Sequence, residues 1–188
     1  MSKLNRPAPA WQIEQWFNTP TPLTLESLRG KVIALESFQM LCPGCVSHGL
    51  PQATRIRASF AAEDVAVIGL HTVFEHHAAM TPTSLQAFLH EYRIHFPVGV
   101  DRAGIDGAPT PRTMSAYFMQ GTPTLTLIDA AGVIRYQYFG QVSDMLLGAQ
   151  IAELVQEANA LRSSTSAIVT EQKSQPQIAG CDEQGCTI

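Results

Sequence analysis

The stretch KVIALESFQMLCPGC, residues 31–45, joins a short apolar run to two cysteines that are separated by two residues. An apolar run of this length, with Glu36 as the single acid inside it, is typical of a buried strand. The segment that follows to Ala62 carries apolar residues among small and basic ones, which predicts a helix that Pro51 kinks. We therefore expect a strand, a dithiol and a helix in that order.

The rest of the chain repeats this alternation of strands and helices. Further elements are predicted as strands at 65–70 and 96–100, a helix at 84–92, and a β-hairpin at 124–139 with a tight turn at 130–132. Apolar residues at three- and four-residue steps predict a final helix over 143–161, with Ser143 as its N-cap. The whole pattern indicates an α/β domain.

Composition limits both the architecture and the partners. A chain of 188 residues is long enough for one domain, and its 45% hydrophobic and 15% charged residues suit a packed core. Its net charge of -4 gives no broad cationic field, so neither nucleic acid nor a membrane surface is expected as a partner. No apolar run approaches a spanning helix, and Arg6 and Pro7 stand where a signal peptide would be apolar. We therefore expect a soluble, cytoplasmic protein.

The domain and its tail differ in composition. We expect one domain over residues 1–162, because the segment after Arg162 has too few apolar residues to bury. Residues 163–188 are expected to form a flexible tail, of which 163–180 would be a linker. The tail carries a second close pair of cysteines, Cys181 and Cys186.

Two close cysteine pairs permit disulfides, a metal site or redox catalysis. In a reducing cytoplasm, paired thiols more often do chemistry or bind metal than form structural disulfides. Cys42 stands at the start of a helix, where free N–H groups and the helix dipole favour the thiolate, and Cys45 lies close enough to resolve a mixed disulfide. We expect Cys42 to attack and Cys45 to resolve, although the same spacing also suits half of a zinc site.

Four separated segments extend this interpretation. They are Leu28-Arg-Gly-Lys-Val-Ile33, Cys42-Pro-Gly-Cys45, Phe96-Pro-Val-Gly-Val-Asp101 and Gly121-Thr-Pro-Thr-Leu-Thr-Leu-Ile-Asp129. In order and spacing they resemble the thioredoxin-like superfamily, particularly its TlpA/ResA-type thiol-disulfide oxidoreductases and redoxin domains, over about residues 11–160. The resemblance implies a thioredoxin-like fold with a central mixed β-sheet, helices on both faces, and an active site where the first core strand enters the dithiol helix.

The resemblance also assigns roles to three further residues. Thr122 and Pro123 fall where the family has a cis-proline that faces the dithiol, so they are candidate substrate contacts. Glu36 falls where thioredoxin carries a buried acid, and strand alternation points it away from Leu35. We expect Glu36 to accept the proton of Cys45, because burial raises the pKa of a carboxyl toward the thiol range. The alternative is a structural acid paired with a neighbour.

The sequence also departs from related patterns. Leu41 stands where thioredoxin has a tryptophan, and Pro51 lies one residue later than in many TlpA-like sequences. Peroxiredoxins have a threonine where this chain has Gln39, which disfavours peroxide reduction. His71 and the His76-His77 pair are expected to be polar surface residues rather than metal ligands.

Three functions compete at this point. The leading one is an enzyme that reduces disulfides in proteins or small thiol substrates, takes electrons from a reductase or thiol donor, and needs no cofactor or metal. The second is a zinc-binding or redox-sensing protein that uses all four cysteines, and the third is a peroxiredoxin-like peroxidase. In the first case Cys181 and Cys186 form a candidate auxiliary dithiol, because a flexible coil from Arg162 has a reach of about 24 Å.

Overall fold

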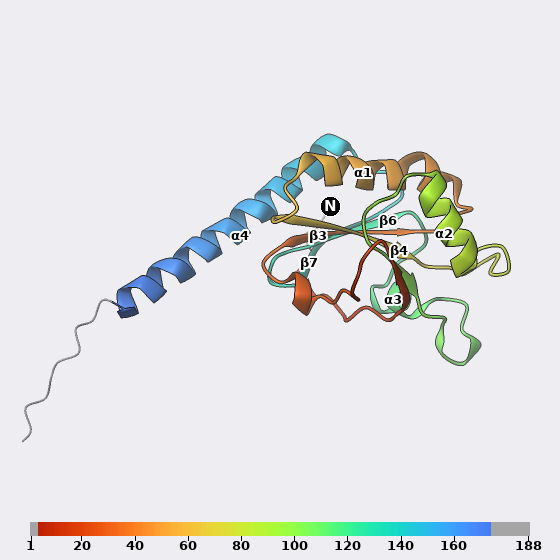
Figure 1. Cartoon of the computed structure of the whole chain (residues 1–188), viewed down its shortest axis with the longest axis horizontal. Helices are drawn as coiled ribbons and strands as arrows, with labels where there is room; N and C mark the ends of the chain where they lie inside the picture. The colour runs from red at the N-terminus through yellow and green to blue at the C-terminus, as the bar shows by residue number, and fades with distance from the viewer. Residues whose placement is uncertain (1–3, 174–188) are drawn as a thin grey trace, which may run out of the picture.

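The computed structural model describes residues 4–173, which form one mixed sheet of seven strands (Figure 1). Strands β3, β4 and β5 run parallel at its centre, and all other neighbours pair antiparallel. In spatial order the strands are β1 (Arg6–Pro7), β7 (Val133–Phe139), β6 (Thr124–Ile128), β3 (Val32–Phe38), β4 (Val65–His71), β5 (Val98–Asp101) and β2 (Ile13–Phe17). This architecture confirms the predicted thioredoxin-like sheet.

Helices cover both faces of the sheet. One face carries α1 (Leu50–Ser59), α2 (Pro82–Glu91) and α4 (Asp144–Lys173), and the other carries α3 (Arg112–Ala116). Three short turns of helix complete the structure: η1 (Glu26–Leu28), the π-helical η2 (Cys45–Gly49) and η3 (Ile105–Gly107). The two faces therefore bury two separate apolar clusters.

Strand β3 leads directly into the dithiol segment and carries Glu36, and all seven of its residues are buried. Its even-numbered side chains face the layer of α1 and α4, and its odd-numbered ones face the layer of α3. Glu36 accordingly lies on the opposite side from Leu35, as alternation predicts, and under the dithiol helix.

The elements expected from periodicity are confirmed, with ends that shift by a few residues except at the end of α4. Strands β1 and β2, the turn η1 and helix α3 were not expected from the sequence. Strand β1 has two residues and includes a proline, and α3 has five residues, so neither is long enough to show a period. Strand β2 pairs at the sheet edge with β5 and is only partly buried, which leaves its apolar alternation weak.

Helix α4 continues past Arg162 to Lys173, into the segment expected to be a linker. Polar residues alone do not end a helix, and between Arg162 and Lys173 the chain has no glycine or proline. Ser143 precedes the helix, and its carbonyl accepts a hydrogen bond from Leu147 N–H at 3.0 Å. The rest of the expected tail, with Cys181 and Cys186, lies outside the described residues.

One expectation about the histidines is wrong. His76 and His77 are exposed, but His71 is buried at the end of β4, with its ring 5.3 Å from that of Phe38. Burial lowers the pKa of His71 to about 4. The residue belongs to a parallel strand that is covered on both faces, which is the reason that an imidazole there packs as a core group.

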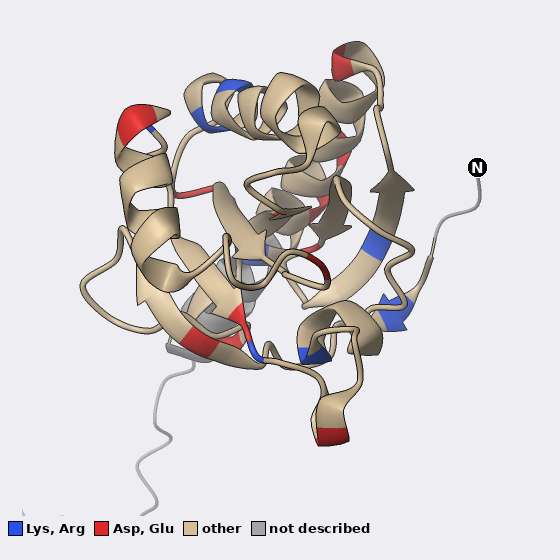
Figure 2. Cartoon of the chain, turned by 90° about the vertical axis from the view of Figure 1, so that its right-hand side faces the viewer, with Lys and Arg blue, Asp and Glu red and all other residues tan. Residues whose placement is uncertain are grey.

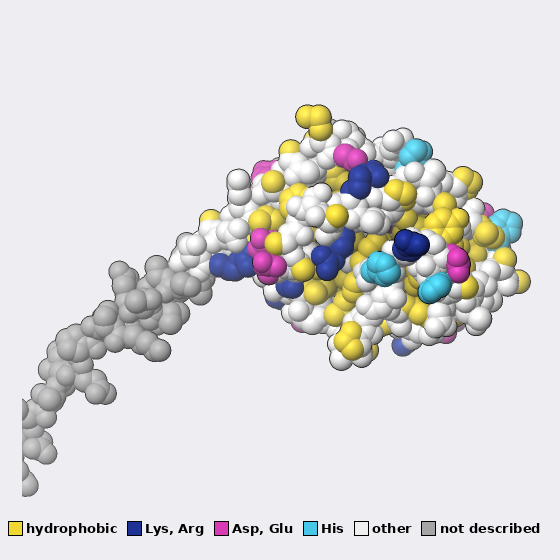
Figure 3. Space-filling view, turned by 45° about the horizontal axis from the view of Figure 1, so that its top comes forward, with side chains coloured by type: hydrophobic (Ala, Val, Ile, Leu, Met, Phe, Trp, Pro, Cys, Tyr) yellow, Lys and Arg dark blue, Asp and Glu magenta, His cyan; other side chains and the backbone are white. Residues whose placement is uncertain are grey.

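Charged residues are spread over the elements instead of clustering on one of them (Figure 2). On the face drawn in Figure 3, basic and acidic side chains are interspersed with apolar ones. No helix within residues 4–173 combines the length and the apolar content needed to cross a membrane.

Candidate active site

The two cysteines of the CPGC motif have different environments. Cys42 lies in the turn after β3 and is partly exposed, whereas Cys45 begins η2 and its exposure is 0%. Both are free thiols. A reagent in solution can therefore reach Cys42 but not Cys45.

The sulfur of Cys42 sits between the helix start and the loop before β6. It accepts a hydrogen bond from Cys45 N–H at 3.3 Å, and it lies 3.5 Å from the carbonyl oxygen of Thr122. The N–H group stabilises a thiolate at this position, while the carbonyl accepts the proton of the thiol form. Both protonation states of Cys42 thus have a hydrogen-bond partner.

The loop before β6 brings the two predicted substrate contacts to the dithiol. The peptide bond between Thr122 and Pro123 is cis. A Cβ atom on Gly44 would lie 3.2 Å from Pro123 Cδ, so the proline ring packs on the helix start. The carbonyl of Pro123 accepts a hydrogen bond from Gly140 N–H at 2.9 Å, which ties this loop to the segment after β7.

The carboxyl of Glu36 is buried beneath the same helix. Burial raises its pKa to about 8, and its Oε1 atom has no hydrogen-bond partner within the described structure. A Cβ on Gly49 would overlap Oε1, so only glycine leaves room for the acid at this point of the helix. No neighbouring basic group pairs with Glu36 in the described part of the chain, which removes the support for a structural ion pair.

Cys45 needs a proton acceptor before it can act as a nucleophile. Burial, and then its hydrogen bond with Cys42, raise the pKa of the Cys45 thiol well above its usual range, although hydrogen bonds with the Gln39 backbone and the Thr122 side chain oppose the change. Gly49, which contacts Glu36, lies about one helical turn or 5–6 Å along the helix from Cys45. Glu36 is therefore a buried base candidate that lies about one helical turn from that thiol.

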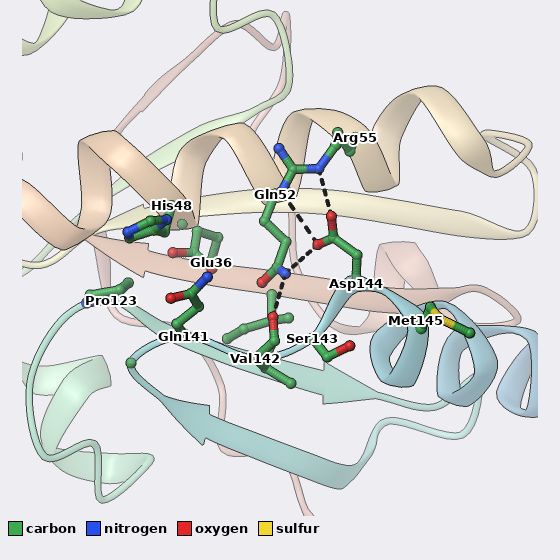
Figure 4. A pocket seen from close by; sticks show the side chains of 13 residues that line it. Glu36, His48, Gln52, Arg55, Pro123, Gln141, Val142, Ser143, Asp144 and Met145 are labelled. Atoms are coloured by element: carbon green, nitrogen blue, oxygen red, sulfur yellow. Dashed lines mark hydrogen bonds and ion pairs between the residues drawn. The ribbon is translucent and has the colours of Figure 1, made fainter.

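A cavity of about 260 Å³ opens from Glu36 toward solvent (Figure 4). Its walls come from the dithiol helix, the loop before β6 and the segment that joins β7 to α4. At its outer side, Asp144 accepts hydrogen bonds from Gln52 Nε2 at 2.6 Å and Arg55 Nε at 2.9 Å. The sequence did not predict these three residues, because Asp144 lies about 90 positions from Gln52 and Arg55 in the chain. A glutamine among the buried positions of α1 was the available signal.

Metal binding has no counterpart in the described part of the chain. Among residues 4–173, no group of three or more His, Cys, Asp or Glu side chains is placed to hold a metal ion. The four-thiolate zinc alternative requires Cys181 and Cys186, which lie outside those residues.

Comparisons with known proteins agree with this geometry. The Redoxin family model matches residues 3–153. The crystal structure of a thioredoxin-like superfamily protein is 66% identical, with a TM-score of 0.78 over 80% of this chain and 96% of the other. That of a thiol-disulfide isomerase from Corynebacterium glutamicum is 47% identical, with a TM-score of 0.74 over 79% of this chain and 96% of the other.

Curated relatives extend the comparison. Thiol:disulfide interchange protein DsbE of Pseudomonas aeruginosa is 27% identical over 155 residues, which is 82% of this chain and 76% of DsbE. Protein DipZ of Mycobacterium tuberculosis is 27% identical over 148 residues, 78% of this chain, and the chain spans only 20% of DipZ. Because the family model covers most of the chain, and a thioredoxin-like protein of solved structure shares its sheet and helices, the chain belongs to the Redoxin family, within the thioredoxin-like superfamily.

Proposed function

We propose that this chain reduces disulfides in protein or small thiol substrates by cycling Cys42 and Cys45 between dithiol and disulfide. The observation that carries the proposal is the contrast within the motif: a partly exposed Cys42 sulfur that accepts an N–H hydrogen bond, beside a fully buried Cys45. Thr122 and Pro123 border the same sulfur, where an extended substrate would lie.

The first step is attack by the Cys42 thiolate on a substrate disulfide. A bond forms between Cys42 Sγ and one substrate sulfur, and the other substrate sulfur leaves as a thiolate that takes a proton from water. The Cys45 N–H group stabilises the attacking sulfur as a thiolate, and the Thr122 carbonyl holds the same sulfur only in its thiol form.

The second step resolves the mixed disulfide. Cys45 gives its proton to the Glu36 carboxylate, and its sulfur then attacks Cys42 Sγ. A disulfide between Cys42 and Cys45 forms, and the substrate sulfur leaves as a thiolate. The substrate gains two electrons, and a dithiol or thiol reductant returns them to the enzyme by the reverse exchange.

Trapping tests the division of roles. Cys45→Ser leaves the attacking thiol but removes the resolving one, so it should accumulate mixed disulfides with substrate, while Cys42→Ser should accumulate none. Non-reducing electrophoresis followed by mass spectrometry identifies the trapped site. Substrate trapped equally well by Cys42→Ser would reject the assignment.

One further expectation from the sequence is carried here as a proposal, and the two alternative functions are tested beside it. We propose a cytoplasmic location, which fractionation of cells that make the native protein would test. The zinc alternative is tested by metal analysis of full-length protein purified without chelator, since a four-thiolate site predicts one zinc per chain. A peroxidase would consume hydrogen peroxide with a thiol donor at a rate comparable to its disulfide exchange.

A further inference from the structure

The resolving step leaves a proton on a carboxyl that is shut off from bulk water on the side of the sheet. Glu36 is 1% exposed, and its unpartnered Oε1 belongs to the wall of the cavity of about 260 Å³. At pH 7 a carboxyl with a pKa of about 8 is mostly protonated, so Glu36 must release a proton before it can accept that of Cys45. Glu36 lines this cavity, which opens toward solvent.

The size and lining of the cavity suit water. A single water needs roughly 10–15 Å³ of such volume and two to four polar partners. Gln52, Gln141 and Ser143 supply amide and hydroxyl groups along the wall, and the last two are exposed. The cavity can therefore hold a short chain of waters between Glu36 and solvent.

Hydrogen bonds between α1 and the segment after β7 hold one wall of the cavity in place. Gln52, on α1, donates from Nε2 to the carbonyl of Val142 at 2.9 Å and to Asp144 Oδ1 at 2.6 Å, and Figure 4 shows both bonds. Arg55 donates to the other carboxylate oxygen of Asp144. These bonds join α1 to the segment 140–143, whose residues face Glu36 across the cavity.

We propose, on the basis of the function proposed above, that this cavity is the path by which Glu36 returns its proton to solvent. Gln52 and Asp144 are positioning residues that hold segment 140–143 against α1 and so keep the polar groups of Gln141 and Ser143 along the path. Glu36 first releases a proton along water to bulk and then accepts the proton of Cys45, while the electron pair stays on the Cys45 sulfur and forms the new disulfide.

Several titratable or charged groups face this path. Cys45 and His48 come from η2, Arg55 from α1 and Asp144 from α4, and the neighbouring positions of β4 and β6 that pair with Glu36 are Gly69 and Leu125. Asp144 is mostly exposed and its pKa is lowered by hydrogen bonds with Gln52 and then Arg55, so it stays ionised across the working range. Changes of the pH profile near neutrality therefore report on Glu36, once His48→Gln has been measured separately.

The experiment follows the two thiolate releases from the chromogenic disulfide DTNB by stopped flow. The full-length chain carries Cys181→Ser and Cys186→Ser, so that only the CPGC motif reacts. The first, concentration-dependent phase reports attack by Cys42, and the second reports resolution by Cys45. Gln52→Leu and Asp144→Asn should leave the first phase unchanged and slow the second about tenfold at pH 7. They should also move the midpoint of its pH profile downward, because a wall that is no longer held to α1 admits water and hydrates Glu36.

Two controls separate this role from general stability. Asp64→Asn removes the carboxylate of a comparable ion pair, in which Arg162 on α4 lies 2.7 Å from Asp64, far from the cavity, and it should change neither phase. Glu36→Gln should slow the second phase by itself, and adding Gln52→Leu should slow it no further.

The outcomes distinguish two failures. If Glu36→Gln leaves the second phase unchanged, the proton-acceptor role in the proposed function is wrong. If Glu36→Gln slows it but Gln52→Leu and Asp144→Asn keep the unsubstituted pH profile, the path is wrong and the acceptor role stands.

Discussion

At the scale of single residues, burial distinguishes the attacking role proposed for Cys42 from the resolving role proposed for Cys45. The two thiols of the motif are chemically identical, and only their positions separate them: Cys42 stays partly open beside the Thr122 carbonyl, while Cys45 points into the apolar cluster under α1. The role proposed for Glu36 depends on the same burial, since an exposed carboxyl would be ionised at every working pH and would be a weak base.

Alkylation should find Cys42 first. In the reduced protein at neutral pH, iodoacetamide should modify Cys42 at least about a hundredfold faster than Cys45, because the Cys45 sulfur is both inaccessible and held as a thiol by burial. Peptide mass spectrometry after short labelling times measures both rates. Faster labelling of Cys45 would reverse the assignment of roles.

Stability should fall as Glu36 ionises. The folded state raises the pKa of Glu36 from 4.5 to about 8, so its contribution is fully present below pH 4.5 and is lost as the pH rises through 8. Glu36→Gln cannot ionise, so its free energy of unfolding should exceed that of the unsubstituted chain by an amount that grows by about 5 kcal/mol from pH 4 to pH 9. Urea unfolding at several pH values measures the difference, with the exposed Glu26→Gln as a control that should show no such trend.

At the scale of elements, the start of the dithiol helix is shaped by two residues that helices usually avoid. Pro51 lacks an N–H group and its ring crowds the carbonyl of the preceding turn, and the wider π-helical turn η2 comes directly before it. Gly49 ends that turn against Glu36. The glycine leaves room for the Glu36 carboxyl beneath the dithiol helix.

Replacing Gly49 should therefore be costly, although alanine favours helices. Gly49→Ala places a Cβ on Glu36 Oε1 and close to Pro123, so it should destabilise the fold by about 1–3 kcal/mol and slow resolution by Cys45. The matched control is Gly148→Ala in α4, where a Cβ meets nothing within 4 Å and alanine should stabilise by about 0.5–1 kcal/mol. Equal effects of the two substitutions on thermal unfolding would show that Gly49 makes no special room for the acid.

At the scale of the whole molecule, α4 determines what the second cysteine pair can reach. The helix is 30 residues long, or about 45 Å, and Figure 1 shows it leading away from the sheet. Its first residue, Asp144, bonds to α1, so Lys173 lies far from the dithiol. The eight residues from Lys173 to Cys181 span at most about 28 Å, and the 13 residues to Cys186 span at most about 45 Å. Neither length exceeds that of α4, and Cys42 lies farther still, ten residues before Gln52, the partner of Asp144, at the end of the dithiol helix that points away from Lys173.

We therefore expect any exchange between the two pairs to occur between copies of the chain. Mild oxidation should produce dimers linked from Cys42 to Cys181 or Cys186, and their yield should rise with protein concentration. Non-reducing electrophoresis and peptide mapping identify the linkage. Monomers that contain this disulfide, at a yield independent of concentration, would show that the tail reaches its own active site.

The sequence by itself determined the order of elements, the dithiol, and the face of β3 that carries Glu36. These features depend on local periodicity and on residue types such as the CPGC motif, which are written along the chain. The sequence did not predict the edge strand β2 or the short helix α3, because their stability comes from neighbouring elements and their own residues show no clear period.

Only the tertiary structure decided how the site is enclosed. Contacts between elements enclose the site: Gly49 lies against Glu36, and Gln52 donates a hydrogen bond to Asp144. The burial of His71 likewise depends on the elements that pack around β4. Side-chain spacing carries no information about such pairs, because the packing of one element on another sets which atoms meet. The sequence alone thus predicted the dithiol, whereas the cavity beside Glu36 exists only in the folded chain.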